Sequence, residues 1–242
     1  MTAAIGWGGL AASSLLIGAL AALVRGWPRR LIGLVLAFGA GALISAVSFE
    51  LALEGSKTGG FAWLAVGLAV GGVTYYLMDG VVERLGAPGR ARERHSSGEG
   101  AGGALALGAF LDGIPEQLVL GIGLAGGEPV SVGLLCAIFV SNLPEAIGSA
   151  SAMRDAGRPA RAIVGLWAGV ALCCALATVA GFALGDAVSG ELRAAIDGFA
   201  AGALIVMLVD SMIPDATQDS GRQAGLVTVL GFALAAALSI AS

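Results

Sequence analysis

The amino-acid sequence predicts an all-α integral membrane protein with eight transmembrane helices, and three observations lead to this prediction. Hydrophobic residues make up 57% of the chain and charged residues only 12%, whereas a soluble domain carries about 25% charged residues. Apolar segments that reach the roughly 20 residues needed to cross a bilayer recur along the whole chain. The 40 glycines suit helices that pack closely in lipid. We therefore expect one transmembrane domain, residues 1–242, embedded in a lipid bilayer.

The expected helices are separated by short connections that contain Gly, Pro or charged residues. The first two spans are divided at Gly26–Pro28, the second and third at Gly55–Lys57, and the fourth and fifth at Gly126–Pro129. Residues 83–102, between the third and fourth spans, are rich in Gly, Ser and charge and are expected to form a flexible loop. The later connections contain arginine. In chain order, the spans are expected at residues 5–24, 31–53, 60–82, 103–125, 129–152, 160–185, 194–213 and 224–241.

The arginines predict how these helices are oriented. In membrane proteins, cationic residues gather in the loops on the cytoplasmic side. Alternate connections hold only Lys57 and Arg193, whereas the other four hold eleven arginines. We therefore expect both chain termini to lie outside the cytoplasm, in the plasma (inner) membrane. The eleven residues are Arg25, Arg29, Arg30, Arg84, Arg90, Arg92, Arg94, Arg154, Arg158, Arg161 and Arg222.

Two distant stretches predict an inverted repeat. Phe38–Ile44 and Phe199–Ile205 share Phe, a run of small residues, Leu and Ile in the same order, and one constant offset relates every pair of matching residues. Their spans are expected to run in opposite directions. Inverted repeats are typical of secondary transporters, although helices rich in Gly and Ala can also resemble one another by chance. The expected 3+2+3 arrangement has a first repeat at 1–82, a cytoplasmic loop at 83–102, central helices at 103–152 and a second repeat at 159–242.

Two acidic stretches interrupt the central spans. Phe110–Glu116 and Phe139–Glu145 are also related by one constant offset, and each ends in Pro-Glu in the middle of an apolar segment. A carboxylate near the centre of a bilayer costs at least about 2.5–3.5 kcal/mol on insertion scales, so a residue of this kind indicates function. Each proline also leaves the carbonyl four residues before it without its helical hydrogen bond.

The polar residues of these stretches predict a cation site. Asp112 and Glu116 share one helix face, Ser141 and Glu145 have the same spacing, and Asn142 lies on a neighbouring part of that face. All offer oxygen ligands, and no lysine or arginine in either span can neutralise the acids. A divalent cation such as Mg, Ca or Mn suits oxygen ligands, and protons are the alternative counter-charge. No resident cofactor is expected, because the metal ion would be the substrate.

A purely structural role is the alternative for each of these residues. The Pro-Glu kinks can shape the bundle with the acids protonated, and Ser141 and Asn142 can form hydrogen bonds between helices. Glu50 and Asp210, closer to helix ends, suit a gate or ordinary solvation equally well. Asp215 is expected to be a solvated charge at a helix end.

Other features exclude several classes of function. Cys136, Cys173 and Cys174 lie in apolar segments, which indicates buried free thiols and not disulfides or a zinc motif. The few basic residues lie in short loops, so no nucleic-acid partner is expected. Small-residue faces such as Gly67 and Gly71 can pack within one chain or between the chains of a homodimer.

Taken together, the eight spans, the loop at 83–102 and the Pro-Glu motifs resemble the ZIP (Zrt/Irt-like protein) family of divalent-metal transporters. The family's fourth and fifth helices carry His-Asn-x-Pro-Glu-Gly and His-x-x-Pro-Glu motifs, and Asp112–Gln117 and Ser141–Ala146 occupy those places here. Val209–Ala216 is similar to the family's acidic, proline-ended seventh helix.

The resemblance implies a binuclear metal centre midway across the membrane. By position, Glu116 and Glu145 would bridge the metals, Asp112 and Ser141 would replace the family's histidines at one metal, and Asn142 would serve the second.

The sequence also departs from the family. Gly113 stands where an asparagine ligand is usual, residues 161–185 lack an acid, and the loop holds His95 but no histidine cluster. These departures predict a weakened or lost second metal position.

The resulting functional prediction is transport of a divalent metal cation (zinc, manganese, iron or a similar ion) through the carboxylate site of the fourth and fifth spans. Two other classes stay open: a non-transporting ZIP-like metal sensor or assembly protein, and an intramembrane enzyme that uses a carboxylate pair. The enzyme is the weakest of the three, because no span shows a Ser-His, Cys-His or His-Glu-x-x-His arrangement. We therefore do not expect an enzyme.

Overall fold

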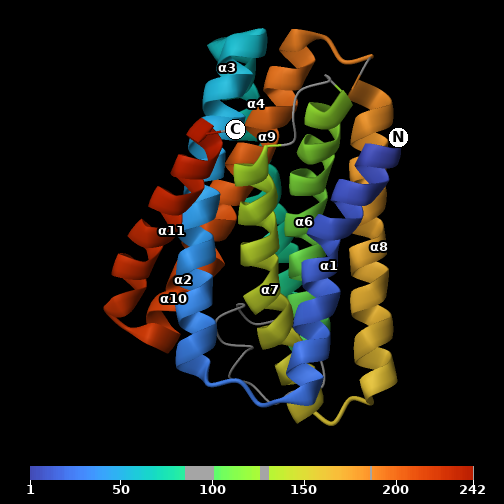
Figure 1. Ribbon diagram of the computed structural model, residues 1–242, viewed down its shortest axis with the longest axis vertical. Coiled ribbons are helices and arrows are strands. Elements are labelled where there is room, and N and C mark those ends of the chain that lie inside the picture. The colour runs from blue at the N-terminus through green and yellow to red at the C-terminus, as the bar shows by residue number, and fades with distance from the viewer. Residues whose placement is uncertain (85–100, 126–130, 186, 242) are drawn as a thin grey trace.

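The protein, seen in a computed structural model, is a bundle of long helices (Figure 1). The structure describes residues 1–84, 101–125, 131–185 and 187–241, with every side chain in these ranges outside 82–84, 101–112 and 241. The helices are α1 (Thr2–Val24), α2 (Arg29–Ala46), a π-helical segment η1 (Val47–Leu53), α3 (Glu54–Gly59), α4 (Phe61–Arg84), α6 (Ala101–Ala125), α7 (Val132–Asp155), α8 (Ala160–Gly185), α9 (Gly190–Met207), a second π-helical segment η2 (Leu208–Met212), α10 (Ile213–Ser220) and α11 (Gln223–Ala241).

Seven helices in the described part of the chain are long and apolar enough to cross a membrane. The expectation of an all-helical chain of the integral membrane kind is therefore confirmed. At the fourth expected span, α6 has 25 residues, of which Gly113–Ala125 form an apolar helix whose side chains are described. The two termini lie at the same end of the bundle in Figure 1.

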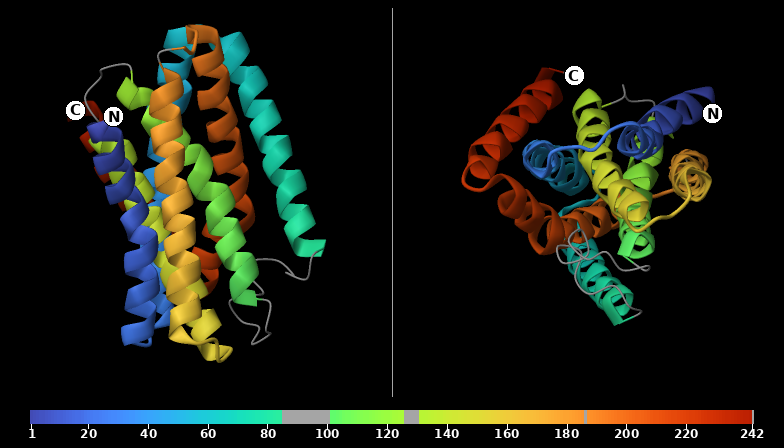
Figure 2. Two further views of the ribbon diagram at one scale, coloured as in Figure 1. Left: turned by 90° about the vertical axis from the view of Figure 1, so that its right-hand side faces the viewer. Right: turned by 90° about the horizontal axis from the view of Figure 1, so that it is seen from below.

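Burial separates central from outer helices. In the apolar windows of Arg29–Gly59 and Val132–Asp155, 67% of the residues are buried, against 22% in Phe61–Val81 and Gln223–Ile240. The end view in Figure 2 accordingly shows α4 and α11 on the outside of the bundle. α2 and α7 therefore form its centre, and the outer helices present their apolar side chains to the surroundings.

The helix α2–η1–α3 and the helix α9–η2–α10 have the same construction. Both are 31 residues long. One offset relates their starts (Arg29, Gly190), the starts of their π-helical segments (Val47, Leu208) and their ends (Gly59, Ser220). This is the same offset that relates Phe38–Ile44 to Phe199–Ile205. Figure 1 shows the two helices running in opposite directions.

Glycines allow the two halves of the chain to interlock. α4 packs against α9, and α11 against α2. A Cβ at Gly71 would lie 2.0 Å from the Phe199 carbonyl oxygen, and a Cβ at Gly231 would lie 2.0 Å from that of Phe38. The first half of the chain is α1 to α4 and the second half is α8 to α11. The middle helix of each half (α2 or α9) therefore contacts the last helix of the other half (α11 or α4) at corresponding residues, backbone against backbone.

The central pair α6 and α7 is held in the same way. α7 packs on α1 and α6 packs on α8, and α6 and α7 also contact each other. A Cβ at Gly18 would lie 2.6 Å from the Leu143 carbonyl oxygen, and a Cβ at Gly181 would lie 2.2 Å from that of Leu118. Both contacts lie within three residues of a Pro-Glu motif, so each motif sits beside a close contact between helix backbones.

Candidate metal site

Glu116 occupies the interior of α6, directly after a proline inside the helix. Its side chain is 2% exposed and both carboxylate oxygens are buried. Pro115 has no N–H to donate to the carbonyl of Leu111, so the backbone next to Glu116 gains acceptor capacity. A buried charge of this kind needs a counter-charge or strong hydrogen bonds, and the location suits a cation ligand.

The turn around Glu116 is tied to α8 by a buried polar contact. Gln117 is fully buried, and its Oε1 accepts a hydrogen bond of 2.5 Å from the Thr178 hydroxyl. The Gln117 Nε2 has no hydrogen-bond partner within the described ranges. This contact fixes the rotation of α6 about its axis and hence the direction in which Glu116 faces.

A thiol fills the space next to Gly113. The sulfur of Cys174, a fully buried residue of α8, lies 2.7 Å from where a Cβ on Gly113 would be. The sequence predicts a buried free thiol here, and this prediction is confirmed. Cys136 and Cys173 are also free, but Cys136 is half-buried and Cys173 is exposed. The prediction of a buried thiol is therefore wrong for Cys173, because α8 turns this position away from the core. Sequence reasoning missed the position of Cys174 beside the motif of α6.

The second motif lies on α7. Ser141 and Asn142 are each 2% exposed, and Glu145 is half-buried. The Ser141 hydroxyl donates a 3.1 Å hydrogen bond to the Ile138 carbonyl, whereas the Asn142 Nδ2 has no partner among the described residues. A Cβ at Gly39 would lie 3.0 Å from the Ser141 Cα, so α2 passes directly over this motif.

The structure thus places four of the five predicted ligands on two helices that touch each other. The fifth, Asp112, belongs to α6, but its side chain lies outside those described. Among the described side chains, which exclude Asp112, no three His, Cys, Asp or Glu residues form a group that could hold a metal ion. The ligand set therefore stays a prediction.

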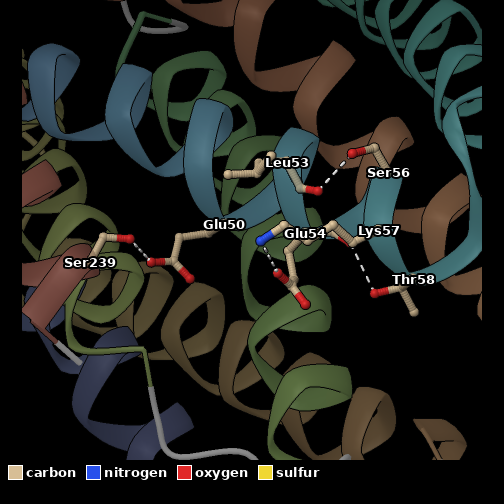
Figure 3. Close-up of polar contacts among 7 residues, drawn as sticks. All are labelled: Glu50, Leu53, Glu54, Ser56, Lys57, Thr58 and Ser239. Carbon is tan, nitrogen blue, oxygen red and sulfur yellow. Dashed lines mark hydrogen bonds and ion pairs between the residues drawn. The ribbon is translucent and has the colours of Figure 1, made fainter.

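Of the acids near helix ends, Glu50 lies in η1 and accepts a hydrogen bond from Ser239 of α11 (Figure 3). Asp210 lies in η2, the corresponding segment. π-helical segments are often found at functional sites. Asp215, expected to be solvated, is only 5% exposed; this prediction is wrong, because the helix continues to Ser220 and packs against α2.

A cavity of about 410 Å³ is lined by residues of η1, α3, α6, α7, α9 and α11. Figure 1 shows α3 and the C-terminus at one end of the bundle. Its acidic lining residues are Glu50, Glu54 and Asp197. Asp197 is 4% exposed, and sequence reasoning missed it. The available signal was an acid inside the expected span 194–213. In fact α9 begins earlier, at Gly190, where Ser189 caps the helix by accepting a hydrogen bond from the Leu192 N–H.

Comparison with known proteins adds one relative. No protein-family model matches the chain. A protein of Arabidopsis thaliana named "Putative zinc transporter" is 29% identical over 193 residues, which cover 78% of this chain and 30% of that protein. The chain thus spans less than a third of that relative's length.

Proposed function

We propose that this protein carries a divalent metal cation across a membrane, through a site built by Asp112, Glu116, Ser141, Asn142 and Glu145 on α6 and α7. The observation that carries the proposal is the burial of Glu116, Ser141 and Asn142, with half-buried Glu145, at Pro-Glu motifs of adjacent helices. The name of the Arabidopsis relative supports metal transport, with zinc as one candidate ion.

The proposed architecture is that of the ZIP family: eight spans in a 3+2+3 arrangement with an inverted repeat. The matching lengths and π-helical segments of α2–η1–α3 and α9–η2–α10 support it. In the proposed topology α6 is the eighth span and both termini lie on one side. The eleven arginines of the opposite connections support an orientation with that side outside the cytoplasm. The membrane would be the plasma (inner) membrane.

In this proposal, the ion exchanges its water for carboxylate, amide and hydroxyl oxygens, which suit hard divalent ions. Freed backbone carbonyls before Pro115 and Pro144 add acceptors where the helices line the site. The two halves then shift relative to each other and expose the site to each side in turn.

The test is uptake of zinc, manganese, iron and cadmium into proteoliposomes by the parent chain and by Glu116→Gln and Glu145→Gln. The matched control is Glu191→Gln, which removes the same charge from an exposed position in the first turn of α9. We expect uptake of at least one ion, lost in both site variants and kept in the control.

Two other results would change the assignment. Metal binding without uptake, lost in both site variants, would favour a metal sensor or assembly protein. If the parent shows neither uptake nor binding, the carboxylates are not a metal site, and proton transfer or an intramembrane enzyme would have to be considered.

A further inference from the structure

Asp197 is a carboxylate that the proposed transport site does not use. It lies two turns into α9 and is 4% exposed. No hydrogen bond or ion pair joins it to another residue in the part of the chain that the structure describes. An ionised carboxylate in such a place is costly unless something compensates its charge.

The cavity is the place where a compensating ion would contact Asp197. Asp197 lines it together with Glu54 and Glu50. The backbone of α3 lies against the Asp197 carboxylate, because a Cβ at Gly55 would be 3.3 Å from its Oδ2. Since Gly55 follows Glu54 directly, Asp197 and Glu54 approach the same part of the cavity, where their two carboxylates act on each other electrostatically.

Two cations also line this cavity, and neither neutralises Asp197 by direct contact. Lys57 pairs with Glu54 at 3.5 Å, but both side chains are more than half exposed, and such pairs contribute little to stability. Arg193, one helical turn before Asp197, attracts its carboxylate electrostatically but forms no ion pair with it among the described residues. The Arg193 Nε has no hydrogen-bond partner among those residues. Three acids against two bases leave the cavity with a net negative charge.

Packing alone does not require an acid at this position. Asp197 stands two places before Phe199, and Leu36 stands two places before Phe38, so Leu36 is the corresponding residue of α2. Leu36 is fully buried. A leucine therefore fills the equivalent place in the first half of the chain. In the second half, a carboxylate stands in the cavity wall at this place, one helical turn from Arg193.

The floor of the cavity lies next to Glu116. Val119 and Leu120, which line the cavity, follow Glu116 by three and four residues and so occupy the same face of α6 about one turn, roughly 5.4 Å, further on. They are 7% and 3% exposed. Glu116 itself is not among the residues that line the cavity, whereas these two apolar residues are.

We propose that Asp197 and Glu54 form a separate binding site for a divalent cation, which holds the ion in the cavity before it reaches Glu116. This inference rests on the proposed transport function for its role, but binding at Asp197 can be measured without transport. The ligands are carboxylate oxygens of a partly hydrated ion, a chemistry suited to Mn²⁺ or Mg²⁺.

The experiment measures Mn²⁺ binding to the purified full-length protein in detergent by electron paramagnetic resonance, in a Glu116→Gln/Glu145→Gln background without the proposed transport carboxylates. We expect this protein to bind one Mn²⁺. Asp197→Asn and Glu54→Gln should each weaken that binding at least about tenfold, since loss of even an indirect partner of a metal ligand costs 10–100-fold in affinity. Glu191→Gln, on the same helix but outside the cavity, should bind as before.

Uptake assays then separate this inference from the transport function. With the transport carboxylates intact, Asp197→Asn should raise the KM for Mn²⁺ uptake about tenfold and leave kcat near the parent value. Because the Glu54 side chain is half exposed, Glu54→Gln should not disturb folding. This variant therefore tests the site even if the substitution of buried Asp197 destabilises the protein.

Two results would overturn the inference: Mn²⁺ binding that neither Asp197→Asn nor Glu54→Gln changes, or a background protein that binds no Mn²⁺. Arg193 would then be the counter-charge of Asp197. Mn²⁺ binding that depends on Asp197, in a parent chain without uptake, would support the cavity site and contradict the transport function.

Discussion

At the scale of single residues, the contact between Gly113 and Cys174 limits the size of the side chain that position 113 can hold. Asparagine is usual at position 113 of that motif, but here the thiol of α8 takes the space beside the glycine. The two residues are therefore a coupled pair. A larger side chain at 113 would force the Cys174 thiol to move, whereas a smaller side chain at 174 would leave room for it.

This coupling is testable by a double-mutant cycle. Gly113→Ala should destabilise the protein by about 1–3 kcal/mol, because its Cβ would lie 2.7 Å from the Cys174 sulfur. Cys174→Ala in the same chain should restore most of the loss. Denaturant unfolding in detergent gives the four free energies, and Gly123→Ala, whose Cβ meets nothing within 4 Å, is the control on α6. Simple additivity of the two substitutions would contradict a direct contact.

At the scale of helices, the second and seventh expected spans continue further than hydropathy indicates. Each runs through a π-helical segment and then a polar last stretch before it ends at Gly59 or Ser220. The following residues, Gly60 and Gly221, have φ angles of 88° and 63°, which glycine adopts without strain. These turns, and not the end of the apolar run, terminate the helices.

The contact between α4 and α9 gives a prediction at this scale. Gly71→Ala should lower the apparent Tm in detergent, because the new Cβ would lie 2.0 Å from the Phe199 carbonyl oxygen and would force the two helices apart. The neighbouring Gly72→Ala places its Cβ 3.5 Å from the nearest atom, on Val206, and should be neutral or slightly stabilising, since Ala favours helix. Equal effects of the two substitutions would show that backbone contact does not hold α4 in place.

At the scale of the whole molecule, the interlocked halves and the shared end of the two termini constrain the topology. An even number of crossings brings both termini to one side. In the proposed orientation, the arginine-rich connections at the other end face the cytoplasm. The cavity with Asp197 opens on the side of the termini, so in the proposed orientation it receives ions from outside.

Cysteine labelling checks this orientation. The three native cysteines are replaced by alanine, and Thr2→Cys or Arg222→Cys is introduced at exposed positions at opposite ends of the bundle. A membrane-impermeant maleimide applied to intact cells should label the cysteine at position 2, and should label position 222 only after permeabilisation. Labelling of position 222 in intact cells would reverse the orientation and make the cavity cytoplasmic.

The composition, the apolar runs and the constant offsets between the paired stretches are properties of the sequence alone. They sufficed to predict a helical membrane protein and the two motifs at Glu116 and Glu145, because an apolar run of about 20 residues has few alternatives to a helix in lipid. The helix limits agreed with the expected spans to within a few residues, except for the two helices that continue as far as Gly60 and Gly221.

Only the tertiary structure decided which side chains from different helices meet. The placement of Cys174 beside Gly113, the burial of Asp215 and the position of Asp197 in a cavity wall all depend on how one helix is shifted and rotated against another. Periodicity specifies the face of a helix but not its partner. In this protein, direct contacts between the backbones of glycine-rich helices determine that partner and therefore the surroundings of each acid.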